Sequence, residues 1–196
     1  MSEPAERYSF TRLETFRECP RKYHLHYIES REPAFETIEA ILGQVVHACL
    51  AWLYRTRQLG VTPSLMDLGS RYVSAWTAAY GPRVKVVKRG ETVSEYSVAG
   101  REMLAQHYQT MFKEDCRETL ATERPFTIRL SGRHLFTGGV DRLARNRDGA
   151  ITVIDYKTTR HPPRALDDEA ALQLRAYGVY ALLAHGADSA RLEYRP

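Results

Sequence analysis

An acidic and a basic side chain lie two residues apart in the segment VIDYKTT, residues 153–159. Successive side chains of a β-strand point to opposite faces, so Asp155 and Lys157 share one face if this segment is a strand. A surface ion pair is the ordinary explanation, and such pairs contribute little to stability. The other interpretation is a strand that leaves the core and opens into a site. The neighbouring residues must decide between the two.

A tight turn at Asp148 and Gly149 is predicted to bring a second carboxylate, Asp141, close to Asp155 and Lys157. The Asp-Gly dipeptide is a strong hairpin signal, so the strand before it folds back beside the strand after it. Carboxylate oxygens are the ligands that Mg²⁺ and Mn²⁺ prefer, and such an ion can polarise a phosphodiester and activate water. A lysine beside the ion can orient that water, help to deprotonate it or stabilise developing charge. A structural charge cluster on the hairpin stays open as the alternative.

Three further side chains are candidates for the same site, each with an ordinary structural alternative. Gln173 and Tyr177 are four residues apart and therefore share a helix face, which can point back at the end of the strand. Amide and phenol groups suit contacts to phosphates, sugars or bases, although a half-exposed helix face often carries them too. His47 lies in GQVVHACL on a predicted helix. Neutral imidazole is a good ligand for divalent metals, but a lone histidine on an apolar helix is usually a core or boundary residue.

The elements that position these residues follow from the hydrophobic pattern. A long amphipathic helix is predicted to end at Gly60, and residues 63–120 are predicted to be mainly helical. After Ala121 the pattern changes to strand-like alternation, giving three strands, a helix that ends at Gly186 and a fourth strand. The first helix has apolar residues at helical spacing at Leu42, Val46, Leu50 and Leu53.

We therefore predict one α/β domain over residues 1–196. Residues 9–120 form a mainly helical region, and residues 121–196 form a β-β-β-α-β core. The sheet of this core is expected to be mixed and mainly four-stranded, with helices on its flanks. Residues 1–8 are expected to be a loose polar start.

Composition bears on the compartment and the partner. A formal net charge of +4 permits a polyanionic partner without demanding one. The three cysteines, Cys19, Cys49 and Cys116, are far apart and odd in number, which argues against a disulfide framework and fits a reducing compartment. No apolar run is long enough to span a membrane, and the N-terminal residues lack a hydrophobic signal region. We expect a cytoplasmic protein with no membrane partner.

Four motifs, in order along the chain, carry a resemblance to a known family. Each is weak alone, but the four in this order are specific, and they cover about residues 9–180. Together they resemble the RecB-like branch of the PD-(D/E)xK nuclease superfamily, which implies a restriction-endonuclease-like core. The motifs are SFTRLETFRECPRKY for S-x-x-x-x-F-x-x-C-P-x-x-Y, GQVVH for G-x-x-x-H, GGVDRLARNRDGAITVIDYKTT for G-x-x-D-R followed by D-Y-K-T, and QLRAY for Q-x-x-x-Y.

The resemblance implies a metal site and a catalytic lysine. Mg²⁺ or Mn²⁺ would be held by the side chains of His47, Asp141 and Asp155 and by the backbone carbonyl of Tyr156. Lys157 would be the catalytic lysine, acting with the two aspartates. The side chain of Tyr156 would pack on the opposite face of the strand.

The resemblance also implies residues around this centre. Gln173 and Tyr177 would contact the nucleic-acid strand near the scissile phosphate. Arg142, beside the first aspartate, would either anchor the hairpin or meet a phosphate. Some relatives have a third carboxylate, for which Glu123 is a candidate.

One feature of several relatives is a 4Fe–4S cluster, held by one cysteine near the Cys-Pro motif and three near the C-terminus. Cys19 matches the first of these, whereas Cys49 and Cys116 lack the spacing of the others. The chain is either a clusterless relative or a fragment, and its stop after LEYRP favours the fragment. We expect the cluster only for a fragment of a longer protein. Otherwise Cys19 is expected to be a small buried hydrophobe.

These residues and the resemblance predict a divalent-metal-dependent DNA nuclease, an exonuclease that acts on single strands or duplex ends. It would hydrolyse phosphodiesters in DNA repair, recombination or CRISPR-type DNA processing, with a helicase or a CRISPR-adaptation protein as partner. Two alternatives stay open. One is a module that binds nucleic acid without cutting it in a larger helicase–nuclease assembly. The other is a structural partner in such a machine.

Overall fold

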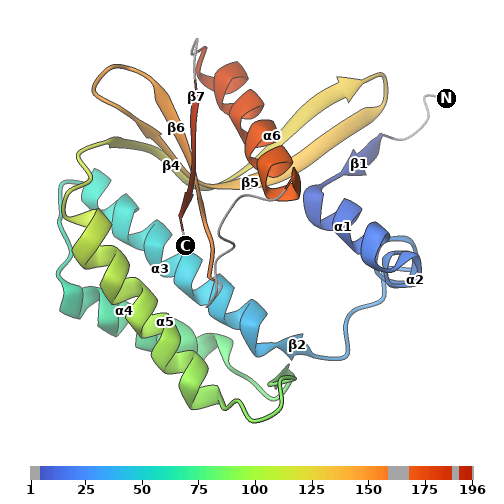
Figure 1. Ribbon diagram of the computed structural model, residues 1–196, viewed down its shortest axis with the longest axis horizontal. Helices are drawn as coiled ribbons and strands as arrows, with labels where there is room; N and C mark the ends of the chain where they lie inside the picture. Colours follow the sequence, from blue (N-terminus) through green and yellow to red (C-terminus); the bar gives the residue numbers. More distant parts are fainter. Residues whose placement is uncertain (1–4, 159–167, 187–189, 196) are drawn as a thin grey trace.

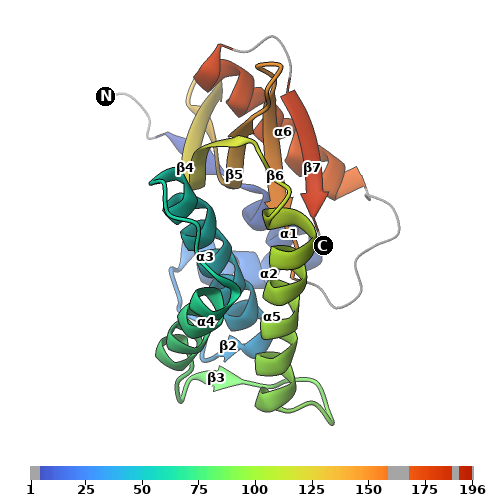
Figure 2. The ribbon, with the colours of Figure 1, turned by 90° about the vertical axis from the view of Figure 1, so that its left-hand side faces the viewer.

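The computed structural model describes residues 5–158, 168–186 and 190–195, and Figure 1 shows a mixed sheet flanked by helices. In chain order the elements are β1 (Glu6–Tyr8), α1 (Phe10–Glu18), α2 (Pro20–Tyr23), η1 (His24–Ile28), β2 (Glu36–Thr37), α3 (Ile38–Gln58), α4 (Leu65–Ala79), β3 (Val84–Lys85), α5 (Val93–His107), η2 (Tyr108–Phe112), β4 (Glu118–Ser131), β5 (His134–Arg145), β6 (Ile151–Tyr156), α6 (Asp168–His185) and β7 (Ala190–Arg195). Helices α3, α4 and α5 gather below the sheet and α6 lies against it (Figure 2). The predicted α/β class is confirmed, and the arrangement is consistent with a restriction-endonuclease-like core.

The main sheet contains the predicted β-β-β-α-β order as β4, β5, β6, α6 and β7. Strand β5 pairs antiparallel with both β4 and β6, while β7 returns through α6 to pair parallel with β6. A fifth strand was not predicted: Glu6, Arg7 and Tyr8 pair parallel with residues 134–136 of β5. Three polar or half-exposed residues carry too little alternation to mark a strand, so only the pairing with β5 reveals this one.

The predicted hairpin between β5 and β6 fixes the register of the site. Gly149 adopts φ +85°, which a glycine accommodates in a tight turn, and the Asn146 backbone N–H donates to the Ala150 carbonyl. Arg142 then stands opposite Ile154. Asp141 is the next residue along β5, and its Oδ2 atom accepts a hydrogen bond from the Tyr156 N–H, so the hairpin brings it close to Asp155 as predicted.

Two hydrophobic cores lie on opposite faces of the sheet, and β6 contributes to both. Ile154 and Tyr156 pack into the core formed with α3, α4 and α5, whereas Ile151 and Val153 pack into the core formed with α6. Every residue of β6 is buried. A strand covered on both faces is held firmly, so it can carry charged groups at its end in a defined position.

Helix α3 forms the centre of the larger core, and the four apolar residues predicted for its buried face are all buried. The helix begins at an N-cap, where the Thr37 hydroxyl accepts a hydrogen bond from the Ala40 N–H. Gly60, with φ +85°, follows its end as predicted. Among the described residues, no helix is long and apolar enough to cross a bilayer.

Candidate active site

Three side chains from three elements converge beside the end of β6. His47 comes from α3, Asp141 from β5 and Glu123 from β4. The His47 Nδ1 atom lies 3.4 Å from Asp141 Oδ1 and 3.7 Å from Glu123 Oε1. One ligand atom from each of the three can be chosen so that all lie within 4.8 Å of one another. His47 thus lies at the boundary of the core, 25% exposed, with its ring edge-on to Tyr156 and its Nδ1 atom facing two carboxylates.

Local backbone features set this convergence. Asp141 is fixed because its Oδ2 atom accepts a hydrogen bond of 2.7 Å from the Tyr156 N–H. Gly43, one turn before His47, brings α3 close to the end of β6: a Cβ atom there would lie 3.2 Å from Thr158 Oγ1. Glu123 has φ +47°, in the left-handed region where side chains other than glycine are strained.

Asp155 and Lys157 lie beside this group and form an ion pair of 2.7 Å between Asp155 Oδ2 and Lys157 Nζ. The Asp155 side chain is only 6% exposed and that of Lys157 is 26% exposed. The bland explanation of a surface ion pair is therefore wrong. A largely buried pair next to two further carboxylates is an arrangement that costs desolvation energy and suits a functional site.

Two residues of helix α6, Gln173 and Tyr177, lie next to Lys157. The Gln173 Oε1 atom accepts from Lys157 Nζ at 3.4 Å, and Gln173 Nε2 donates to the Tyr177 hydroxyl at 2.6 Å. Tyr177 is 6% exposed and packs edge-on against Phe126. The two residues thus reach the site as predicted, but both polar ends of the glutamine amide contact protein. This geometry holds the lysine; a direct contact to nucleic acid stays a prediction.

Burial, together with the closeness of several carboxylates, shifts the pKa values in this group. Burial raises the pKa of Asp155, and the Asp141 charge adds to the rise, while the Lys157 ammonium opposes it. Burial and the charge of Asp141 raise the pKa of Glu123 in the same way. Burial disfavours the charged imidazole of His47, but the contact with Asp141 outweighs it and raises the pKa of His47. Burial is thus the main cause of the raised pKa values of Asp155 and Glu123, and the neighbouring carboxylate Asp141 adds to both.

The residues fit a divalent cation. Two ligand atoms at about 2.1 Å from one ion lie about 3 Å apart, so the contacts from His47 to Asp141 and Glu123 need little adjustment. One imidazole with several carboxylates is a donor set that Mg²⁺ and, better, Mn²⁺ accept. A solvent-open hollow of about 380 Å³, lined by His47, Glu123 and residues of α3, gives access to them. His47, Glu123 and Asp141, with Asp155 beside them, would hold the ion.

Arg142 lies in the core, where the predicted phosphate contact is impossible without unfolding. It is 1% exposed, its Nη1 atom pairs with Asp115 Oδ2 at 2.6 Å, and its Nε atom donates to Thr119 Oγ1 at 3.1 Å. Its guanidinium carbon lies 3.5 Å from the centre of the Tyr54 ring. The phosphate-binding assignment for Arg142 is therefore corrected, and its anchoring alternative accounts for the contacts.

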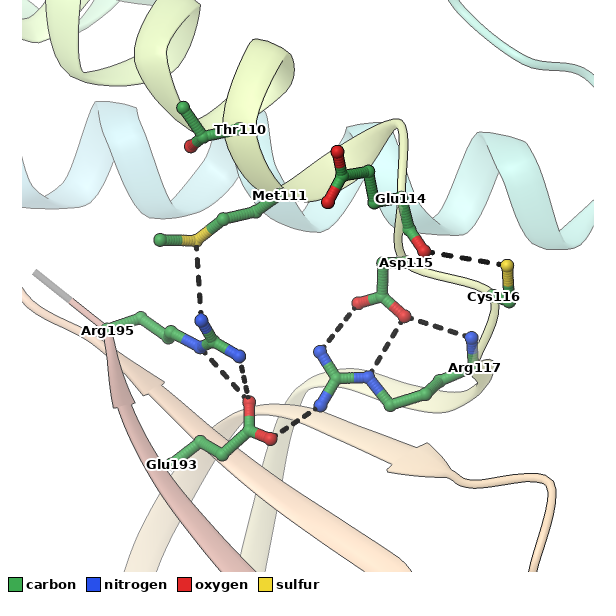
Figure 3. Close-up of a pocket in the computed structure, with 8 residues that line it drawn as sticks. All are labelled: Thr110, Met111, Glu114, Asp115, Cys116, Arg117, Glu193 and Arg195. Carbon is green, nitrogen blue, oxygen red and sulfur yellow. Dashed lines mark hydrogen bonds and ion pairs between the residues drawn. The ribbon is translucent and has the colours of Figure 1, made fainter.

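Asp115 is the partner that the sequence did not reveal. Figure 3 shows its carboxylate facing Arg117, which also pairs with Glu193, and Glu193 in turn pairs with Arg195. Asp115 follows the end of η2 with no surrounding pattern, so nothing in the sequence marks it. Together Asp115, Arg117, Arg142, Glu193 and Arg195 form what we call the paired cluster.

The side chain of Tyr156 packs on the face of β6 opposite Asp155, as predicted, and its ring lies edge-on to His47 at 6.3 Å. It is stacked 6.5 Å from the Tyr54 ring and lies edge-on to His107 at 5.3 Å. Burial and the positive charges of Arg142 and Arg195 lower the pKa of His107 to about 4, so this imidazole is neutral at pH 7. The carbonyl of Tyr156 as a metal ligand stays a prediction.

The cysteines occupy separate environments. Cys19 is exposed and caps α2, because its Sγ atom accepts from the Lys22 N–H at 3.4 Å. The expectation of a small buried hydrophobe at Cys19 is therefore wrong. Cys49 is buried in α3, and Cys116 is exposed.

Comparison with models of known protein families gives a match over nearly the whole chain. The family model of the PD-(D/E)XK nuclease superfamily matches residues 7–194, nearly the whole chain. A search of curated proteins gave no match. The matched range includes all the residues of the convergent group described above.

Proposed function

The chain belongs to the PD-(D/E)XK nuclease superfamily, and from this premise we propose that it is a divalent-metal-dependent nuclease that hydrolyses phosphodiesters in DNA. The observation that carries the proposal is the convergence of His47, Glu123 and Asp141 next to the buried pair of Asp155 and Lys157. We define these five residues as the site cluster. The G-x-x-x-H and Q-x-x-x-Y motifs further support a place in the RecB-like branch.

The metal would be held by His47, Glu123, Asp141 and Asp155. When bound, Mg²⁺ or Mn²⁺ supplies Lewis acidity towards a phosphoryl oxygen and makes water a better nucleophile at neutral pH. The protein contributes rigid placement of these donors, because β5 and β6 are paired and β6 is buried on both faces. Rigid placement avoids reorganisation during the reaction.

Lys157 is proposed as the catalytic lysine. Its ammonium group stands at the edge of the site cluster, where it can orient the attacking water and stabilise negative charge that develops on the phosphate. Asp155 fixes one side of this ammonium at 2.7 Å, and Gln173 contacts it at 3.4 Å. Tyr177 in turn holds the glutamine amide. We assign Gln173 and Tyr177 to positioning the lysine. The solvent-exposed part of the Gln173 side chain stays available to contact the nucleic-acid strand.

The substrate proposed is DNA, as single strands or duplex ends, and the proposed action is exonucleolytic. A nuclease of this kind would serve DNA repair, recombination or CRISPR-type processing, with a helicase or an adaptation protein as partner. The basic net charge supports a polyanionic substrate, and the solvent-open hollow beside His47 and Glu123 gives it access to the site cluster.

The test is a cleavage assay on end-labelled single-stranded and double-stranded DNA in EDTA, Mg²⁺ or Mn²⁺. Wild type is compared with Asp155→Asn and Lys157→Ala. Asp148→Asn is the matched control, because Asp148 is an exposed acid of the β5–β6 turn that pairs with Arg191. We expect cutting only with metal, a fall of about 10²–10⁴-fold in Lys157→Ala, at least as large a fall in Asp155→Asn, and no change in Asp148→Asn.

Two outcomes would contradict the proposal. Cleavage that persists in folded Asp155→Asn would mean that another site or a contaminant does the chemistry. Salt-dependent DNA binding by the wild type without cleavage in any divalent metal would instead favour a binding module.

A further inference from the structure

A helical arm at the N-terminal side leaves its apolar side chains uncovered. We define the arm as α1, α2 and η1, residues 10–28. Against the described part of the chain, Thr15 is the one buried side chain of the arm, while Leu13, Phe16 and Ile28 are 41%, 52% and 57% exposed. Helices of globular proteins usually bury an apolar face, so this arm calls for a partner. In Figure 1 the arm lies to the side of the α3–α5 layer.

The exposed ring of Phe16 and the half-buried rings of Tyr23 and Tyr27 are already assembled into a platform. Phe16 packs edge-on against Tyr23 with ring centres 5.3 Å apart, and Tyr23 lies 5.2 Å from Tyr27. The guanidinium of Arg12 lies 5.3 Å from the Tyr23 ring centre and 5.0 Å from that of Tyr27, and its Nε atom donates to the Tyr23 hydroxyl. His26 adds a ring 4.5 Å from Tyr27. Mutual contacts of this kind hold the rings in place before a ligand arrives.

The charge of the arm favours one kind of partner. Within residues 10–28 there are four Arg or Lys residues and two Glu residues, so the formal charge of the arm is +2. Aromatic rings interleaved with cations are the surface that single-stranded nucleic acids bind: bases stack on the rings and phosphates meet the cations. A protein partner with an apolar helix would make less use of the cations, which here are Arg12, Arg17, Arg21 and Lys22.

The start of the arm, at α1, packs against the core that contains Tyr177, one of the two lysine-positioning residues. Phe10 packs edge-on against Phe136 of β5 at 5.5 Å, within the same core as Tyr177. Glu14 is close enough for its charge to act on Tyr177. Figure 1 shows α1 beside one end of α6, the helix of Gln173. A strand lying on the arm would therefore be directed towards Lys157.

We propose that the aromatic and cationic face of this arm binds the unpaired bases of a single-stranded nucleic acid and guides the strand to the site cluster. The proposal rests on the proposed nuclease function and adds a substrate form and a surface to it. It predicts that the chain prefers single strands or frayed ends to fully paired duplex.

The test measures binding of a labelled oligodeoxythymidine and of a blunt, closed-end duplex by fluorescence anisotropy, in an Asp155→Asn background that prevents cutting. Phe16→Ala and Tyr27→Ala remove single rings, and Tyr80→Ala is the matched control, an aromatic residue at the end of α4 that is 45% exposed. Thermal melting and circular dichroism check that every variant folds. We expect each arm variant to lose about tenfold in affinity for the single strand, with no loss for the duplex or in the control.

Two further readouts separate base stacking from a structural role. In Phe16→Trp, which keeps a stacking ring, affinity should be retained and the added tryptophan fluorescence should be quenched by the oligonucleotide. In the catalytically competent chain, Phe16→Ala should raise KM for single-stranded DNA and leave kcat unchanged.

Hydrolysis of a small chromogenic phosphodiester, which cannot reach the arm, tells the two proposals apart. Its hydrolysis should be equal in wild type and Phe16→Ala, and its absence in wild type would count against the nuclease function itself. Equal single-strand affinity in Phe16→Ala, Tyr27→Ala and the Tyr80→Ala control would overturn the arm proposal, whatever the small substrate shows, and would leave the platform to a protein partner.

Discussion

Two groups of charged side chains lie close to the β5–β6 hairpin, and they differ in how their charges are balanced. In the paired cluster, Asp115 contacts two arginines, and their hydrogen bonds outweigh the effect of burial and hold the pKa of Asp115 well below its usual range. In the site cluster, three carboxylates share one lysine and one imidazole, and the pKa values of Asp155 and Glu123 are raised.

The difference separates carboxylates that are paired within the fold from carboxylates that are available to a ligand. Carboxylates with matched guanidinium partners are satisfied within the protein, so removing one leaves a buried cation without its partner. Carboxylates crowded together are under-compensated, and a bound cation would balance them. Asp141 and Arg142 are neighbours on β5, yet Asp141 belongs to the site cluster and Arg142 belongs to the paired cluster.

The largest expected effect on stability comes from replacing one aspartate by asparagine in each of the two clusters. Asp115→Asn should lower the free energy of unfolding by about 3–5 kcal/mol, because it breaks a buried ion pair. Asp155→Asn should lower it less, because burial and the charge of Asp141 disfavour the charged form of Asp155, which offsets part of the loss of its ion pair with Lys157. Urea unfolding of both variants measures this, and an equal loss in the two would remove the distinction between the clusters.

The pH dependence of stability sharpens the same comparison. The pKa of Asp115 is lower in the folded state than in the unfolded chain, so its stabilisation is present above the unfolded value of about 4 and is lost as pH falls through the folded value. The stability difference between wild type and Asp115→Asn should therefore be constant from pH 7 to about pH 5 and shrink in stronger acid. Denaturant unfolding across this range tests it, and a difference that grows in acid would reverse the assigned sign.

A smaller effect is expected at the strained backbone of Glu123. Glu123→Gly should raise the free energy of unfolding by about 1 kcal/mol, since glycine adopts φ +47° without strain, and should weaken Mn²⁺ binding. Ser30→Gly is the matched control, because Ser30 has φ +55° away from the site cluster. It should gain similar stability and bind Mn²⁺ as wild type does. A loss of stability in Glu123→Gly would show that this backbone is not strained.

The smallest effect is expected at Tyr177. Tyr177→Phe removes the hydroxyl that accepts from Gln173, which is worth about 1 kcal/mol and so about fivefold in kcat. KM for DNA should stay the same, because the tyrosine is buried and acts through Lys157. Steady-state kinetics give both numbers. A rise in KM with constant kcat would favour the direct nucleic-acid contact that the sequence predicted.

Sequence patterns predicted the parts of the site that local signals specify. The Asp-Gly turn set the β5–β6 register, and therefore brought Asp141 to Asp155 and Lys157. Gly43 and His47 are four residues apart on one helix, so they share a face of that helix, and this local spacing is visible in the sequence. The third carboxylate, Glu123, reached the site through pairing of β4 with β5, a long-range contact that left only a weak hint in the sequence.

Other features depended on packing that no local pattern records. Arg142 follows a site residue in the chain, but its side chain points into the core towards Asp115, a partner from another element. The strand Glu6–Tyr8 is too short for alternation to show. The arm has the apolar residues of an ordinary amphipathic helix, and only the structure shows that Leu13, Phe16 and Ile28 are exposed.

The measurement that tests the central claim most directly is a calorimetric titration of Mn²⁺ into the wild type, Asp141→Asn and Asp148→Asn. The claim is that the under-compensated carboxylates of the site cluster hold a divalent cation. It predicts binding in the wild type and in Asp148→Asn, whose altered residue lies on the exposed turn, and loss of binding in folded Asp141→Asn. Equal Mn²⁺ binding by Asp141→Asn and the wild type would contradict it.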